Sequence, residues 1–177
     1  MPPLSSHRLP IFPRRCIAPN LHTVETAPTY LVVIDATDES RVALRFAALR
    51  AAHVGARVAL IHVIRPPEFM QWGAVQEAMA AEAQAEAEAV LAGHADEAEV
   101  LAGARPSVMV LNGDAAPVIL DHVRNDSTVR ALVLGAAPKG APGPLISFFT
   151  GERAGQLPCV VIIVPGGLEA ERLESLT

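Results

Sequence analysis

Five short runs of apolar residues limit most strongly what this chain can fold into. Each run is rich in Val, Leu and Ile and hardly alternates with polar residues, which is typical of strands buried on both faces. The runs cover residues 30–34, 58–64, 107–111, 131–134 and 159–164. Between them lie segments with helical spacing or strong helix formers, about residues 40–54, 77–100, 114–126 and 145–156. This alternation predicts a parallel sheet with helices on both faces.

We therefore predict a Rossmann-like, three-layer α/β sandwich around a five-stranded parallel sheet. The 177 residues suffice for one domain, and the 51% that are hydrophobic are ample for its core. Residues 29–167 form this domain, and residues 168–177 form a C-terminal tail. The first 28 residues contain six prolines and no regular period, so we expect a disordered leader. A targeting or docking arm is the alternative. Gly93 predicts a weakness or a break in the second helix.

The charge of −5 and the cysteine content exclude several classes of function. A net negative chain lacks the positive field of a general nucleic-acid or anionic-membrane surface. No apolar stretch approaches the roughly 20 residues of a membrane span. Cys16 and Cys159 form no CxxC motif and no disulfide framework, which predicts the reducing cytoplasm. The six histidines show no metal-ligand spacing, so we predict no metal site and see no catalytic constellation.

In such sheets, ligands bind at the carboxyl ends of the strands where the strand order reverses. The segment after the first run, Asp35-Ala-Thr-Asp-Glu-Ser40, contains no glycine. It therefore lacks the GxGxxG of a dinucleotide site. Asp35 ends the strand, and either a ribose or base contact or a purely structural role fits it equally well. For Thr37, Asp38 and Ser40 we expect helix capping.

The segment after the fourth run, Gly135 to Pro144, is rich in glycine and proline and contains Lys139, the only lysine in the chain. Glycines let backbone N–H groups approach an anion closely, and a predicted helix follows. A plain irregular loop is the alternative interpretation. The GxxxxGK[ST] pattern fails because Ala141 and Pro142 replace its last two residues, which disfavours a P-loop NTPase.

Several motifs in this order resemble the universal stress protein family over about residues 29–166. They are the strand ending in Asp35, Ser40 five residues on, and the segments 60–64, 113–114, 132–135 and 158–165. The resemblance implies an adenine nucleotide α-hydrolase-like fold and a cytoplasmic stress-response role. It also implies a homodimer in which the last strands, Val160–Val164, pair edge to edge. Its protein clients are not indicated.

Members of this family that bind ATP or AMP resemble G-x2-G-x9-G-[ST] after the fourth strand. Carried over, the first glycine is Gly135, but Pro138 and Phe148 stand at the second and third positions. The nearest later glycine is Gly151, and Glu152 follows it in place of a hydroxyl residue. A phosphate-binding loop in this chain would therefore use a shifted set of glycines, namely Gly140, Gly143 and Gly151.

The resemblance thus implies a site for ATP or AMP with at most weak hydrolysis. A non-nucleotide-binding, dimeric regulatory or interaction protein of the same fold is the alternative. The predicted nucleotide contacts are Asp35, Ala36, Thr37, Val63, Gly135, Lys139, Gly140, Gly143 and Gly151.

Overall fold

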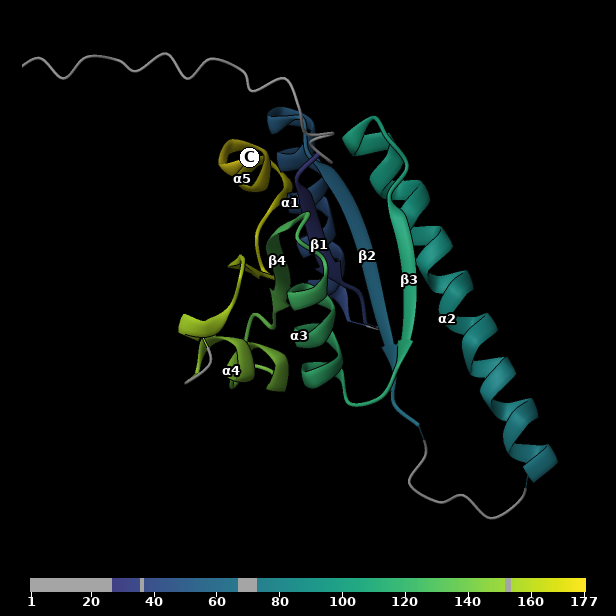
Figure 1. Ribbon diagram of the computed structural model, residues 1–177. Helices are drawn as coiled ribbons and strands as arrows, with labels where there is room; N and C mark the ends of the chain where they lie inside the picture. Colours follow the sequence, from purple (N-terminus) through teal and green to yellow (C-terminus); the bar gives the residue numbers. More distant parts are fainter. Residues whose placement is uncertain (1–26, 36, 67–72, 152–153) are drawn as a thin grey trace, which may run out of the picture.

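The computed structural model describes residues 27–35, 37–66, 73–151 and 154–177. Its sheet has five strands, all parallel, in the order β3-β2-β1-β4-β5 (Figure 1). The strands are β1 (Thr29–Val33), β2 (Arg57–Ile64), β3 (Ser107–Asn112), β4 (Val129–Ala136) and β5 (Val160–Pro165). The predicted five-stranded parallel sheet is confirmed.

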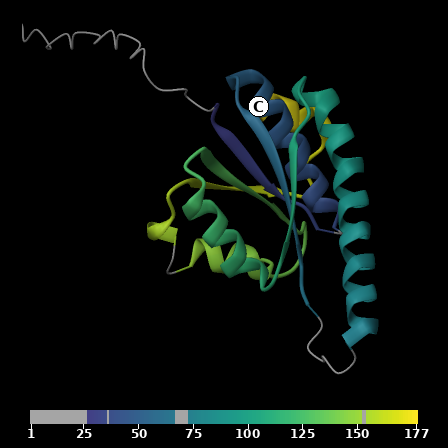
Figure 2. The same ribbon diagram turned by 45° about the vertical axis from the view of Figure 1, so that its right-hand side comes forward.

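Helices cover both faces of the sheet and make a three-layer sandwich, as predicted (Figures 1 and 2). The helices are α1 (Asp38–Val54), α2 (Gly73–Ala102), α3 (Ala115–Asn125), α4 (Pro144–Thr150) and α5 (Ala170–Leu176), with a short 3-10 helix, η1 (Ala154–Gln156). The first face packs against α1, α2 and α5, and the second against α3 and α4. None of the helices within the described residues could cross a membrane.

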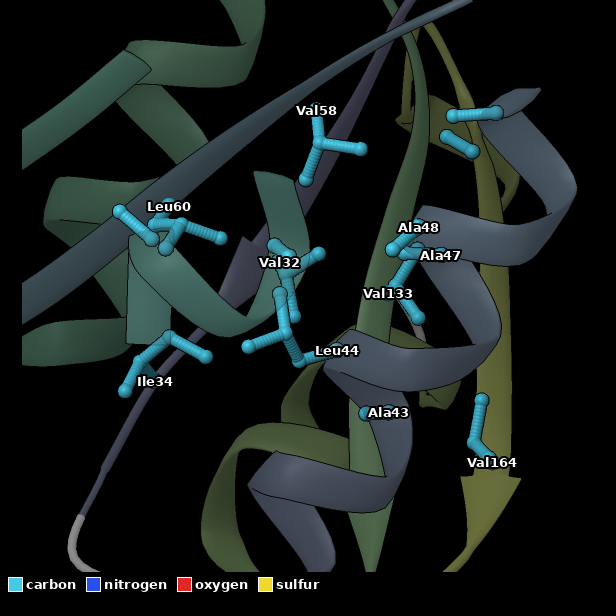
Figure 3. Packing of buried hydrophobic residues seen from close by; sticks show 14 of the residues in the cluster. Val32, Ile34, Ala43, Leu44, Ala47, Ala48, Val58, Leu60, Val133 and Val164 are labelled. Carbon is cyan, nitrogen blue, oxygen red and sulfur yellow. The ribbon is translucent and has the colours of Figure 1, made fainter. Parts of the chain in front are cut away.

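The two faces of β1 belong to two separate hydrophobic clusters, because successive side chains of a strand point to opposite sides. Val32 and Ile34 lie in the cluster under α1, whereas Leu31 and Val33 lie in the cluster under α3. Figure 3 shows the first cluster, in which small α1 residues such as Ala47 let the helix approach the sheet. Burial on both sides explains why the sequence of β1 is continuously apolar.

The predicted break at Gly93 is wrong, because α2 runs without interruption for 30 residues. One glycine inside a helix costs about 1 kcal/mol relative to alanine. The many Ala and Glu residues around Gly93 are strong helix formers. Packing of the buried Leu91 and Ala95 on the sheet stabilises the helix further and outweighs that cost.

The C-terminal third departs from the prediction at two places. The helix expected over residues 145–156 ends at Thr150, because Gly151 caps it with its N–H on the Ser147 carbonyl at 3.1 Å. The expected tail contains α5, whose Leu173 is only 2% exposed. The leader predicted for residues 1–28 lies outside the described residues up to residue 26.

Candidate functional site

The strand order reverses between β1 and β4, which are neighbours in the sheet although far apart in the chain. Strand β1 leads to β2 and β3 on one side, and β4 leads to β5 on the other. The segments after β1 and β4 therefore meet at the carboxyl edge of the sheet, which we call the crest. The crest is where a doubly wound sheet binds ligands.

The turn from Asp35 to Ser40 is held by side-chain hydrogen bonds. The Asp35 Oδ1 accepts from the Thr37 backbone N–H at 3.0 Å and also from the Thr37 hydroxyl. The same Thr37 oxygen accepts from the Ser40 N–H at 3.4 Å, so Thr37, one of the three predicted capping residues, is the N-cap of α1. The buried Ser40 hydroxyl lies 2.8 Å from the Thr37 carbonyl oxygen and 3.1 Å from that of Asp35.

These bonds leave one atom at the crest with open hydrogen-bonding capacity. The side chain of Asp35 is exposed, and no hydrogen bond to its Oδ2 occurs within the described residues. The first turn of α1 carries two acidic residues, Asp38 and Glu39. They complement the helix dipole but repel a second anion at the same place. The arrangement suits a neutral hydroxyl donor beside Asp35 better than a phosphate.

Gly135 brings β4 directly against the first turn of α1. A Cβ added at Gly135 would lie 2.3 Å from the Glu39 carbonyl oxygen, which no real side chain permits. A Cβ at Gly166, just after β5, would lie 2.6 Å from the Glu39 Cβ. The two glycines thus hold the N-terminus of α1 close to the crest from both sides. The sequence pattern gave no indication of this contact at Gly166.

The loop after β4 is exposed from Ala137 to Pro142 and contains Lys139 and Gly140. Gly140 has a φ of 98°, a backbone conformation that favours glycine, and open space where a Cβ would be. Gly143 is the N-cap residue of α4 and is likewise unobstructed. Lys139, Gly140 and Gly143 therefore belong to one accessible loop.

Gly151 does not belong to this loop. It caps the opposite end of α4 from Gly143, and its N–H already bonds to Ser147. A single cradle made of Gly140, Gly143 and Gly151 is therefore not assembled in the structure. Ala36 and Glu152 lie outside the described residues.

Strand β2 contributes Val63, which is half-buried on the α3 side near the end of the strand. Its neighbour His62 points to the other side, with Nδ1 2.8 Å from the Ile34 carbonyl oxygen. Because a carbonyl only accepts, Nδ1 carries the proton and His62 donates. This bond fixes the chain one residue before Asp35. Within the described residues, no three His, Cys, Asp or Glu side chains gather as a metal site.

The fold and the site together define a class of protein: a doubly wound α/β domain. At its switch point lie a carboxylate, a helix N-terminus and a glycine loop. The chain belongs to the universal stress protein family, whose model matches residues 28–165. It is accordingly a stress-response domain of that family. No curated protein matches the chain.

Solved structures agree with this fold. Universal stress protein UspA from Lactobacillus plantarum has a TM-score of 0.64 at 17% identity, covering 78% of this chain and 97% of its own. A universal stress protein family protein from Arabidopsis thaliana with AMP bound has a TM-score of 0.57 at 15% identity, covering 81% and 94%. A universal stress protein in complex with cAMP has a TM-score of 0.54 at 16% identity, covering 80% and 98%.

Proposed function

We propose that the crest binds an adenine nucleotide, AMP or ATP. The observation that carries the proposal is the exposed Asp35 carboxylate at the switch point, held by Thr37 with one oxygen left to accept. Two family members of the same fold are known with AMP and with cAMP, which supports an adenine nucleotide as the ligand class. Asp35 Oδ2 accepts from a ribose hydroxyl, and Thr37 lies beside it in the same turn.

The phosphate end of the nucleotide lies against the loop after β4. Lys139 supplies a positive charge there, and the open backbone at Gly140 and Gly143 lets N–H groups approach the anion. Gly135 takes part indirectly, because its close contact with Glu39 sets the spacing between this loop and the turn at Asp35.

Hydrolysis is at most weak in this proposal. Phosphoryl transfer depends on positioned groups that stabilise the charge developing on the phosphate. Pro138, at the position of the family's second glycine, has no N–H to donate. Gly151 is occupied as a helix cap. The site is therefore suited to binding a nucleotide and sensing it rather than to turnover.

Isothermal titration of the full chain with AMP and ATP tests the proposal, with Asp35→Asn as the variant. An asparagine keeps the Oδ1 bonds to Thr37 but turns the free acceptor into an NH2 donor, so the turn survives while the ribose contact is lost. Loss of a hydrogen bond to a charged group costs about 1.5–3 kcal/mol, or about 10- to 150-fold in affinity.

The matched control is Glu171→Gln, which removes the same charge from the exposed start of α5. It should leave binding unchanged, whereas Lys139→Ala should weaken ATP more than AMP. Absence of heat with folded wild-type protein would show that the crest is not a nucleotide site.

The β5 edge favours a second proposal, a homodimer through Val160–Val164. Among the described strands, β5 pairs only with β4, so one row of its backbone groups has no strand partner. Val160 is 61% exposed and Ile163 is 39% exposed, which makes this edge both unpaired and apolar. Such an edge is a template for another strand, and a second copy offers the same surface.

Light scattering during size-exclusion chromatography tests the dimer. The double variant Val160→Lys with Ile163→Lys should elute as a monomer, because lysines on an edge oppose strand pairing. Val108→Lys is the control, since Val108 is half-exposed on the opposite edge strand. If both variants keep the wild-type mass, the dimer does not use β5.

We propose a cytoplasmic site of action, to which the free thiol of Cys159 is suited.

A further inference from the structure

Two adjoining cavities lie on the α3 side of the sheet. The first is at the edge opposite the crest, and the second runs along α3 toward the carboxyl end of β3. The first, of about 300 Å³, includes Arg57, Ala59, Met109 and Thr128 in its lining. The second, of about 500 Å³, includes Leu111 and Val118. His122 lines both, so we treat them as one groove between α3 and β3. Its size is within the range of ligand pockets, about 300–1,000 Å³.

The groove exists because, among the described helices, only α3 and α4 pack on this face. Figure 1 shows α3 and α4 in front of the sheet, with β3 at the edge beyond α3. On the other face β3 is packed against α2. Met109 and Leu111 of β3 therefore stay only half-buried, as does Val118 of α3. An apolar strip next to an edge strand offers a docking surface for a further segment of chain.

Charged groups are distributed unevenly along the groove. At its narrow end Arg57 makes no ion pair within the described residues, while the neighbouring Asp126 carboxylate accepts from the Thr128 N–H and hydroxyl at 2.8 and 2.7 Å. At its wide end the exposed Asp121 also has no ion pair in the described part of the chain. The groove therefore offers a cation first and an anion further on.

The described chain begins at the narrow end of this groove. The Pro28 carbonyl accepts from the Arg57 N–H at 2.8 Å, and the Thr29 N–H donates to the Thr128 carbonyl at 2.9 Å. Arg57, Thr29 and Thr128 all line the cavity. The 26 residues that precede Ala27 are thus tethered at the rim of the groove.

We propose that residues 17–25 bind in this groove of their own molecule. Ile17, Leu21 and Val24 supply the apolar side chains for the half-buried strip of β3 and α3. Glu25, three residues before Pro28, pairs with Arg57 at the narrow end. Nine extended residues span about 30 Å, which is ample for a groove beside a strand of six residues.

The charge order of the leader matches that of the groove. Going away from Pro28, the sequence presents the acidic Glu25, then the apolar residues, then Arg15 and Arg14. The groove presents Arg57, then Met109 and Leu111, with Asp121 at the wide end. Opposite charges at both ends fix the direction in which the segment lies. Because the segment is covalently attached at the rim of the groove, its effective concentration at the groove is high.

Disulfide trapping tests the proposal in full-length protein whose own cysteines are changed by Cys16→Ser and Cys159→Ser. The trapped pair is Ile17→Cys with Val118→Cys, because Ile17 lies eight residues from Glu25 and Val118 lines the wide end of the groove. The control pair is Ile17→Cys with Val100→Cys, because Val100 is 84% exposed on α2, over the other face. In glutathione buffers the groove pair should show an effective concentration at least about tenfold above the control.

Equal values for the two pairs would overturn the proposal. So would a groove disulfide that forms only between two chains and rises with protein concentration, since the segment would then occupy a second copy.

Hydrogen exchange provides a readout that does not depend on which leader residue lies opposite which groove residue. The leader double variant Leu21→Asp with Val24→Asp leaves every side chain of the folded domain in place. It should speed amide exchange in residues 107–118 by at least about threefold and leave β5 unchanged. The same exchange rates in wild type and variant would mean that the segment does not cover the groove.

Discussion

At the residue scale, two glycines decide how the candidate site is built. Gly135 and Gly166 lie at the ends of neighbouring strands, and both contact Glu39 in the first turn of α1. The family motif associates a glycine at the position of Gly135 with phosphate, but here its missing side chain makes room for a helix. The glycine that we propose for ligand access is Gly140, whose surroundings are open.

Gly135→Ala should destabilise the fold, because its Cβ would overlap the Glu39 carbonyl and force α1 outward. Overpacking of this kind costs about 1–3 kcal/mol in the free energy of unfolding. Urea denaturation measures it. Gly155→Ala is the control, since nothing lies within 4 Å of a Cβ there. Wild-type stability of Gly135→Ala would mean that α1 shifts freely at the crest.

Asp126 predicts a pH dependence of stability. The Thr128 hydroxyl and N–H hold the pKa of this carboxyl below its usual value, with smaller help from His122 and Arg57. A lowered folded-state pKa contributes stability above the unfolded pKa, and that stability is lost as pH falls through the folded value. Asp126→Asn should therefore lower the free energy of unfolding at pH 7 by up to about 1 kcal/mol.

The difference in the free energy of unfolding between Asp126→Asn and wild type should shrink as the pH falls below about 4, the usual pKa of an aspartate in the unfolded chain. It should vanish below the lower pKa of the folded state. Urea titrations at pH 7 and pH 3 measure it. A difference that is constant with pH would mean that the charge of Asp126 has no part in stability.

At the element scale, α2 is the least supported helix for its length. Among its side chains that the structure describes, the buried ones begin only at Ala87, and Figure 2 shows its N-terminal turns extending past the end of the strands. Helix propensity therefore matters more here than in α1, where small residues pack against the sheet throughout.

Gly93→Ala should stabilise the protein. Gly93 is exposed in the middle of α2, and a Cβ there meets nothing within 4 Å. Alanine loses less conformational freedom than glycine, so the gain should be about 0.5–1 kcal/mol. Thermal unfolding followed by circular dichroism measures it. A lower melting temperature would indicate a hidden need for glycine at this point of the helix.

At the scale of the whole molecule, the two candidate ligand surfaces use different parts of one sheet. The crest carries Asp35 and the loop after β4, whereas the groove opens where the chain enters β1. Neither surface shares a residue with the other. Changes at one should therefore leave binding at the other intact unless the two are coupled through the sheet.

AMP should raise the melting temperature of the wild-type chain, because a ligand that binds only the folded state stabilises it. At about 100 times the dissociation constant the gain is about 2.7 kcal/mol. Asp35→Asn should lose most of this shift at the same AMP concentration. The leader double variant Leu21→Asp with Val24→Asp should keep it, and loss of the shift in that variant would show that groove and crest are coupled.

The local sequence was enough to predict the layers of the fold and part of the crest. Strands buried on both faces must be apolar throughout, and that pattern is visible without any partner in view. The hydroxyl of Thr37, placed just before a helix, likewise identified the cap of α1. Asp35 was singled out because ligand sites in such sheets follow the strand ends, and the structure places it at the crest.

Contacts between distant residues were decided only by the tertiary structure. Whether Gly93 breaks a helix depends on Leu91 and Ala95 packing on strands, and whether Gly135 faces a ligand depends on Glu39, almost a hundred residues away. A glycine has the same local signature in a turn, a cap or a close approach. Periodicity records which way a side chain points, but the partner it meets is set by how the layers come together.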